Sequence, residues 1–165
     1  MKTLWKFLGL LGIVAALAVG TAQEAPATNP SSAPALVQGQ VLYVPVYSHI
    51  FAGTAAGEFN LTSTLSLRNT DLDSAITLTS VRYYDSAGAL VRSYLEEPQQ
   101  LGPLASTEVV VKEKDSSGGA GANFIVEWSA QEPVTPPVVE AVMISTTLGQ
   151  GLSFVSSARV LEQTP

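Results

Sequence analysis

The sequence contains no cysteine and a single histidine, His49. Without thiols the chain cannot form a disulfide, a zinc–thiolate site, an iron–sulfur cluster or a cysteine nucleophile. One histidine also leaves too few nitrogen ligands for an ordinary zinc or copper site. We therefore expect no metal and no cofactor. We also expect a core stabilised by packing alone, which 165 residues with 46% hydrophobic content allow.

Basic residues are scarce as well. Lys and Arg number 8 against 14 Asp and Glu, which gives a formal net charge of −6 at pH 7. A field of that sign repels phosphate backbones, so nucleic acid is excluded as a partner.

The N-terminal residues have the pattern of a secretory signal peptide. Lys2 and Lys6 precede an uncharged apolar run, Phe7–Val19, and small residues follow up to Ala22. The run is shorter than the roughly 20 residues that a membrane-spanning helix needs. We expect a signal peptide over 1–22 and an exported protein, periplasmic or secreted, with no transmembrane span after cleavage. An uncleaved anchor and a buried N-terminal helix are the alternatives.

The rest of the chain divides into a linker and one domain. Residues 23–40 are rich in Ala, Pro, Ser and Thr, and such a stretch cannot bury enough surface to offset its ordering entropy. From Val41 onward short runs of strand formers alternate with turn residues, and no window has helical spacing of apolar residues. This predicts an all-β domain over 41–162, an antiparallel two-sheet immunoglobulin-like sandwich of about seven to eight strands. A closed or half-open barrel is the second choice.

Three local features of the strands are predicted. The first run, Val41–Phe51, contains Pro45, so we expect it to be an edge strand or to be bulged there. The run Ile76–Asp85 changes phase between its halves, which a bulge near Thr79–Ser80 would reconcile. The tight turns are expected at residues 85–88 and 149–151.

A glycine-rich segment is the most unusual part of the chain. Residues 115–123 read Asp-Ser-Ser-Gly-Gly-Ala-Gly-Ala-Asn. A phosphate loop would carry a lysine and lead into a helix, but here a strand follows. The segment is interpreted either as a hairpin loop or as a loop that grips a ligand, with these candidate residues: Asp115, Gly118, Gly119, Gly121 and Asn123.

Two further candidate ligand contacts lie outside that segment. Tyr83 and Tyr84 are adjacent and must point to opposite faces of a regular strand, so Tyr84 is the candidate for an exposed contact. His49 is the only possible histidine base, although a lone histidine is more often a hydrogen-bonded structural residue. No catalytic residue is assigned.

Acidic pairs leave a second class of function open. Asp71 with Asp73, Glu96 with Glu97, and Glu113 with Asp115 are solvated turn residues by the simplest interpretation. Paired carboxylates also serve calcium binding and glycoside hydrolysis.

Several stretches together resemble the bacterial domain of unknown function family DUF 3124, over roughly Val41 to Leu161. The resemblance implies an exported bacterial protein and supplies no catalytic residues. The stretches that carry it are Val44–Ile50, Asn60–Thr62, Leu65–Asp71, Ser80–Asp85, Leu101–Ala105, Lys114–Phe124, Glu140–Met143 and Ser153–Ser156.

The sequence therefore favours a non-enzymatic exported sandwich that binds or bridges an unknown protein or small-molecule partner. Because sandwiches leave strand edges exposed, addition of a partner's strand is plausible. A carbohydrate- or calcium-binding module is the alternative. A hydrolase that uses His49 or an acid pair is the third hypothesis.

Overall fold

The computed structural model describes residues 34–52, 57–146 and 151–165. The expected signal peptide, most of the expected linker and most of the turn at 149–151 lie outside these residues. Within them no helix has the length and apolarity to cross a bilayer. The strands are β1 (Val37–Pro45), β2 (His49–Ala52), β3 (Gly57–Asn60), β4 (Thr62–Arg68), β5 (Ile76–Tyr84), β6 (Leu90–Ser93), β7 (Gln99–Leu101), β8 (Ser106–Val111), β9 (Asn123–Val134), β10 (Val138–Ser145), β11 (Leu152–Ser157) and β12 (Arg159–Thr164).

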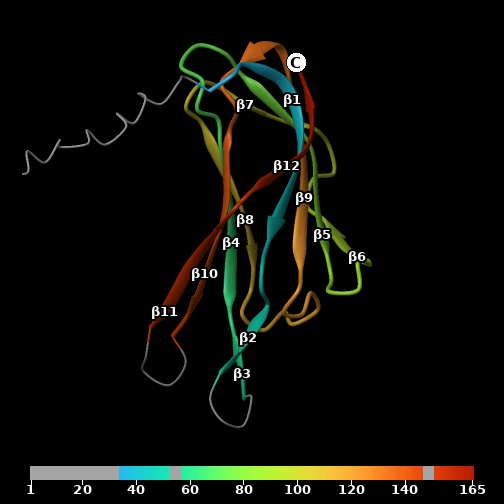
Figure 1. Ribbon diagram of the computed structural model, residues 1–165, viewed down its shortest axis with the longest axis vertical. Helices are drawn as coiled ribbons and strands as arrows, with labels where there is room; N and C mark the ends of the chain where they lie inside the picture. The colour runs from blue at the N-terminus through green and yellow to red at the C-terminus, as the bar shows by residue number, and fades with distance from the viewer. Residues whose placement is uncertain (1–33, 53–56, 147–150) are drawn as a thin grey trace, which may run out of the picture. The chain divides into compact units, whose positions relative to one another are not determined.

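The strands form two main antiparallel sheets, which confirms the predicted sandwich. One sheet has the order β12-β1-β9-β5-β6, with β7 added to β5, and is called the large sheet below. The other has the order β11-β10-β4-β8 and is called the small sheet. Figure 1 shows the strands of the small sheet on one side and those of the large sheet on the other. A separate hairpin, β2–β3, precedes β4.

The core lies between the sheets and follows the alternation of the strands. In β4 the buried side chains are Ser63, Leu65 and Leu67, while Thr64 and Ser66 face outward. Phe124, Val126 and Trp128 of β9 are buried in the same manner. One face of each sheet is thus apolar and the other polar, which is usual for antiparallel sheets packed on one side only.

The predicted bulge in β5 is confirmed. The register between β5 and β9 shifts between Leu78 and Ser80. As a result Ile76 and Leu78 before the shift, and Val81 and Tyr83 after it, are all buried. The bulge lets both halves of an out-of-phase strand contribute to the core.

The prediction that the first strand is an edge or is bulged at Pro45 is wrong, since Val44 and Pro45 pair with Phe124 and Asn123 in continuous register. β1 lies inside the large sheet, paired with β9 on one side and with β12 on the other. The pairing with β12 ends at Tyr43, so Pro45 lies beyond the end of that ladder and its missing donor is not needed. The first strand also begins at Val37, because Val37 is buried and pairs with Val134. The predicted linker boundary at residue 40 is therefore too late.

The strand count was underestimated, since the structure has twelve strands in its described residues. The expected run Val41–Phe51, for example, is broken into β1 and β2. β11 and β12 meet at Ala158, whose amide donates to Val139 O at 3.0 Å. On either side of this residue β11 belongs to the small sheet and β12 to the large sheet. In Figure 1 this red segment runs from β11 toward β1. The shortest strand, β7, has three residues and pairs with β5.

Candidate functional site

The glycine-rich segment forms the connection between β8 and β9 and is bonded to two other parts of the sandwich. Its carbonyls accept from the amides that follow β1, at Val46 and Ser48, with 3.0 Å for each bond. The carbonyl of Gly118 accepts from both the amide and the hydroxyl of Ser86, which lies in the β5–β6 turn. The segment therefore ties the β1–β2 junction to the β5–β6 hairpin.

Two glycines in this segment are required by its geometry. A Cβ at Gly118 would lie 1.9 Å from the hydroxyl oxygen of Tyr83, which no side chain can accommodate. Gly119 has φ +75° and would place a Cβ 2.6 Å from Ser86 Oγ. Glycine is favoured at positive φ because it lacks the Cβ clash. These residues thus have structural reasons to be glycine, apart from any ligand.

Amides that a ligand would need are already engaged. The amide of Gly119 donates to Ser116 O at 3.2 Å, and that of Gly121 donates to Ser86 Oγ at 2.9 Å. A phosphate-binding loop presents its amides to the ligand instead. The hydrogen bonds therefore favour the hairpin-loop interpretation of the segment over the ligand-gripping one.

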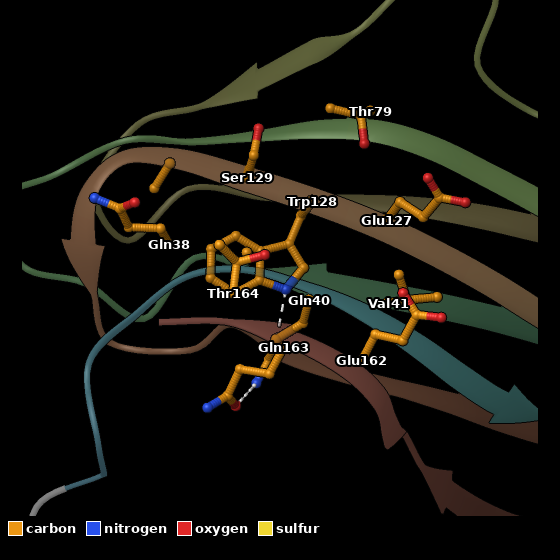
Figure 2. Close-up of a pocket in the computed structure, with 12 residues that line it drawn as sticks. Gln38, Gln40, Val41, Thr79, Glu127, Trp128, Ser129, Glu162, Gln163 and Thr164 are labelled. Atoms are coloured by element: carbon orange, nitrogen blue, oxygen red, sulfur yellow. Dashed lines mark hydrogen bonds between the residues drawn. The ribbon is translucent and has the colours of Figure 1, made fainter.

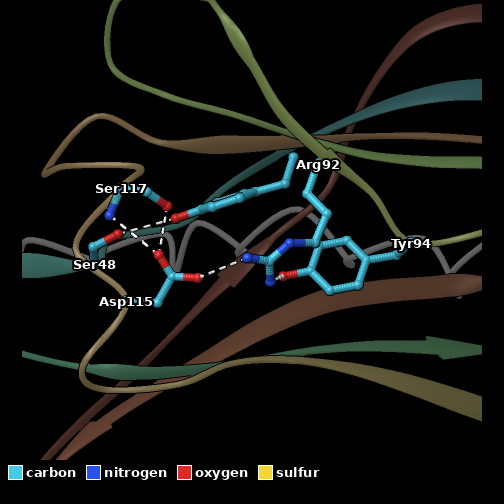
Figure 3. A network of polar contacts seen from close by, with 6 residues as sticks. Ser48, Arg92, Tyr94, Asp115 and Ser117 are labelled. Atoms are coloured by element: carbon cyan, nitrogen blue, oxygen red, sulfur yellow. Dashed lines mark hydrogen bonds and ion pairs between the residues drawn. The ribbon is translucent and has the colours of Figure 1, made fainter.

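A polar network joins the start of this segment to β6 (Figure 3). Arg92 of β6 lies 3.4 Å from Asp115 Oδ2 and donates to the Tyr94 hydroxyl at 3.2 Å. The Ser117 hydroxyl and amide both donate to Asp115 Oδ1. The hydroxyl bond of Ser117 is the main reason that the pKa of Asp115 is lowered, and Arg92 contributes further. Asp115 thus remains a carboxylate that orders its own turn.

The inner member of the tyrosine pair anchors the same region. Tyr83 is buried, and its hydroxyl shares a 2.9 Å hydrogen bond with Ser48 Oγ. Burial raises the pKa of Tyr83. Ser48 and Ser86 were missed by sequence reasoning, because isolated serines carry no signal of the distant partners that they bond.

Tyr84 and Asn123 lie together on the outer face of the large sheet, as adjacent partners in the β5–β9 ladder. The guanidinium of Arg82 lies 6.0 Å from the Tyr84 ring centre and pairs with Glu127. Such cross-strand ion pairs are expected for arginines on a wet strand face. Both candidates are therefore half-exposed parts of this face, close to the end at which the glycine-rich segment joins β9.

His49 lies apart from this group of side chains, on the β2–β3 hairpin. Its Nε2 is 3.9 Å from Glu58 Oε1 on the paired strand, and its ring packs edge-on against Phe51 at 5.1 Å. Among the described residues no group of three or more His, Cys, Asp or Glu side chains could hold a metal ion.

A cleft on the large sheet, of about 390 Å³, is shown in Figure 2. At its centre the Trp128 indole donates to Gln40 Oε1 at 3.3 Å, and the Gln40 amide donates to Gln163 Oε1 at 2.9 Å. This chain of bonds joins β9, β1 and β12. These bonds provide hydrogen-bond partners for the buried side chain of Gln40 and hold the C-terminal strand against β1.

At one end of the sandwich a buried asparagine links two loops, the one after β4 and the one after β7. The Asn69 amide donates to the carbonyls of Ser74, Leu101 and Gly102 at 2.8–3.2 Å. Its Oδ1 accepts from the amide of Asp71 at 3.0 Å. Asp71 belonged to a candidate calcium pair, but both of its oxygens accept backbone amides, from residues 73, 74 and 135. These bonds lower the pKa of Asp71, with the bond from residue 135 as the largest cause.

The same loops present Leu104 in an unusual conformation. Leu104 has φ 57°, and no other non-glycine residue among those described has a positive φ. Its amide donates to Asp71 O at 3.2 Å, and its side chain is 66% exposed. A left-handed conformation is unfavourable for a residue with a Cβ. The fold therefore holds a large apolar side chain in solvent at a cost in backbone strain.

Leu104 borders a groove on the outer face of the small sheet, which is called the sheet groove below. Its volume is about 890 Å³. The register places Thr64 between Val142 and Val110, Ser66 between Glu140 and Glu108, and Arg68 between Val138 and Ser106. The lining residues are Thr64, Ser66, Arg68, Asn69, Thr70, Leu104, Ser106, Glu108, Val110 and Val142.

Two carboxylates, Glu108 in the sheet groove and Glu140 beside it, face a single basic residue, Arg68. Arg68 lies 4.0 Å from Glu140 and donates to Ser66 Oγ at 2.9 Å. In the described part of the chain no ion pair involves Glu108. The middle of the groove is thus acidic, with apolar side chains toward each end.

These features define a cysteine-free antiparallel sandwich whose loops are ordered by hydrogen bonds. The chain belongs to the family described as "Protein of unknown function (DUF3124)", whose model matches residues 39–161. This confirms the family resemblance found in the sequence.

A search of curated proteins gave no match. Among solved structures the chain is similar to the one titled "Crystal Structure of Thermotoga maritima 1070", with a TM-score of 0.45 and 10% sequence identity. The alignment covers 78% of this chain and 97% of that one.

Proposed function

We propose that the chain is an exported, non-enzymatic module that binds an extended segment of a protein partner in the sheet groove. The observation that carries the proposal is Leu104, which borders the groove with φ 57° and a largely exposed side chain. The left-handed conformation costs a non-glycine residue about 1–2 kcal/mol. Strain of this kind, kept where glycine would relieve it, is typical of residues that contact a ligand.

The chemistry of the groove defines the segment that would fit it. An extended segment that runs along β4 presents alternate side chains to the sheet, two residues apart. The segment would place apolar side chains next to Leu104 and beside Val110 and Val142. Over Glu108, between them, it would place a lysine or arginine, because a basic group complements the unpaired carboxylate. The proposed ligand is therefore a basic residue flanked by apolar residues at alternate positions.

The test is a selection from a random peptide library displayed on phage, with the full-length chain expressed and processed in its host. The recovered peptides are expected to carry a basic residue two positions from an apolar one. The best peptide is then synthesised with a fluorescent label and titrated by anisotropy. Recovery of acidic peptides, or no enrichment over the library, would overturn the proposal.

Two variants locate the binding site of that peptide. Leu104→Gly removes the apolar contact and is expected to weaken binding at least about tenfold, since burying a leucine side chain contributes roughly 1.5–3 kcal/mol. Glu108→Gln is expected to weaken binding by about twofold to fivefold, the usual range for an exposed ion pair. The matched control is Glu162→Gln, an exposed glutamate on β12 of the other sheet. Equal binding by all three variants would place the peptide elsewhere.

Export is the part of the proposal that rests on sequence alone. The charged start, the apolar run Phe7–Val19 and the small residues up to Ala22 support it. Mass spectrometry of the protein recovered from the periplasm or the medium is expected to show a mature chain that begins near residue 23. A chain that retains Met1 would argue against cleavage.

A further inference from the structure

The outer edge of the small sheet is open at β11. This strand pairs with β10 in a continuous register from Leu152 to Ser157 and, among the residues that the structure describes, with no other strand. Its sequence, Leu-Ser-Phe-Val-Ser-Ser, has no charged residue and no proline. Free strand edges are normally protected by charges, prolines, bulges or short length, because they can pair with another chain. β11 has none of these protections.

The other free edges in the described residues do carry such protection. β12 contains Arg159 and Glu162 and has a register shift opposite Val41 and Leu42. β6 contains Arg92 and also has a register shift. β8 contains Glu108, β7 has only three residues, and β2 and β3 of the separate hairpin have only four residues each. The contrast singles out β11 as the edge suited to accept a strand.

We propose that β11 pairs antiparallel with β11 of a second copy of this chain, with Val155 on the two-fold axis. In a symmetric antiparallel pair, opposing residues must point to the same face, so the axis passes through one residue rather than between two. With Val155 at the axis, Phe154 opposes Ser156 and Ser153 opposes Ser157 of the second copy. No like charges meet, whereas copies of a chain with net charge −6 repel one another in general.

This register also continues an apolar row across the two copies. On the outer face of the small sheet Val155 is next to Val142, which is followed by Thr64 and Val110. Val155 is 55% exposed and Val110 46% exposed. Pairing at β11 would cover Val155 with its counterpart and join two four-stranded sheets into one. Pairs of β-branched residues directly opposite each other stabilise a sheet.

The pairing has a consequence that rests on the proposed function. Two sheet grooves would lie on one continuous sheet face, so the dimer could hold two segments of one partner or bridge two partners. Two linked sites raise the effective affinity without any new contact.

The absence of cysteine makes the pairing directly testable. Val155→Cys introduces a unique thiol at the proposed axis, where the two Cα atoms would be about 4.5–5.5 Å apart, a spacing that permits a disulfide. Val110→Cys is the matched control: an exposed valine on the outer face of the opposite edge strand of the same sheet. With mild oxidant, Val155→Cys is expected to form covalent dimers about tenfold faster than the control, because paired thiols have a high effective concentration.

Charge variants test the same axis without oxidation. By sedimentation velocity the wild-type protein is expected to dimerise as its concentration rises. Val155→Glu is expected to remain monomeric, because the two introduced carboxylates would lie opposite each other at the axis. Val110→Glu is expected to dimerise still. Mixing Val155→Glu with Val155→Lys is expected to restore the dimer.

The outcomes separate this proposal from the proposed function. A monomeric wild type, with both cysteine variants cross-linking at the same slow rate, would overturn the pairing. Peptide binding by monomeric Val155→Glu would show that the groove works without it. A dimer that binds no selected peptide would retain the pairing and overturn the groove.

Discussion

Gly118 and Tyr83 are in contact at a distance that only glycine permits, because a Cβ on Gly118 would lie 1.9 Å from the tyrosine hydroxyl oxygen and 2.5 Å from Cζ. The hydroxyl cannot retreat, since Tyr83 is buried and shares a hydrogen bond with Ser48. The contact therefore fixes the glycine-rich segment against the inner face of β5. It joins a loop to the core, and neither residue taken alone in the sequence predicts this contact.

Gly118→Ala is expected to destabilise the fold by about 1–3 kcal/mol, the usual cost of overpacking a rigid site. The control is Gly102→Ala, where nothing lies within 4 Å of the added Cβ. Urea unfolding followed by tryptophan fluorescence measures both. An alanine at position 118 that proved as harmless as the control would mean that Tyr83 and the loop separate in solution.

Asn69→Ala is expected to lower the free energy of unfolding by at least about 2 kcal/mol. The substitution removes the donor for three carbonyls and the acceptor for the Asp71 amide in a side chain that is 2% exposed. Buried groups left without partners cost about 1–3 kcal/mol each. Asn60→Ala, an exposed asparagine at the end of β3, is the control and should change stability little. A similar effect of both substitutions would argue against the ordering role of Asn69.

The features that the sequence predicts well are local. The change of phase in β5 is set within a few residues, so the bulge was predicted correctly. The opposite orientations of Tyr83 and Tyr84 follow from the two-residue period of a strand. The hairpin turn at residues 85–88 was also predicted, and Gly88 has φ 81° there.

The features that were missed depend on partners far away in the chain. β1 was predicted to be an edge because of Pro45, yet β12 covers it through contacts such as Gln40 with Gln163, separated by 123 residues. Leu104 follows a Gly-Pro pair that indicates a turn, but the pair does not indicate the positive φ of Leu104. The turn is also held by a hydrogen bond from Asn69 to Gly102 O, and Asn69 lies more than thirty residues earlier. The sheet groove exists only after β4, β8 and β10 have paired, so no single segment encodes it.

Glycine and alanine are expected to rank in opposite orders at two exposed leucines. At Leu104, with φ 57°, Leu104→Gly should be more stable than Leu104→Ala by about 1 kcal/mol, because glycine has no Cβ penalty in the left-handed region. At Leu72, which is 72% exposed and lacks a positive φ, Leu72→Ala should be the more stable of the pair. Thermal unfolding of the four variants measures the two differences. The same order at both positions would show that Leu104 is not strained.

Asp71 is expected to account for part of the loss of folding stability at low pH. Backbone amides, foremost that of Thr135, lower its pKa in the folded state below the ordinary 3.8. Because the folded pKa is lower than the unfolded one, the stability from Asp71 is fully present above about pH 4. It is lost as the pH falls below 3.8 through the lowered folded value.

Asp71→Asn removes this titration. It also replaces one acceptor oxygen with an NH2 group, which cannot accept a hydrogen bond from a backbone amide such as that of Thr135. The variant should be less stable than wild type near pH 7, and the difference should shrink as the pH falls below 3.8. Asp73→Asn keeps every bond that Asp71 accepts and is the control. Urea unfolding at a series of pH values measures the difference between wild type and each variant. A difference for Asp71→Asn that stays constant down to low pH would mean that the carboxylate charge contributes nothing to holding these loops together.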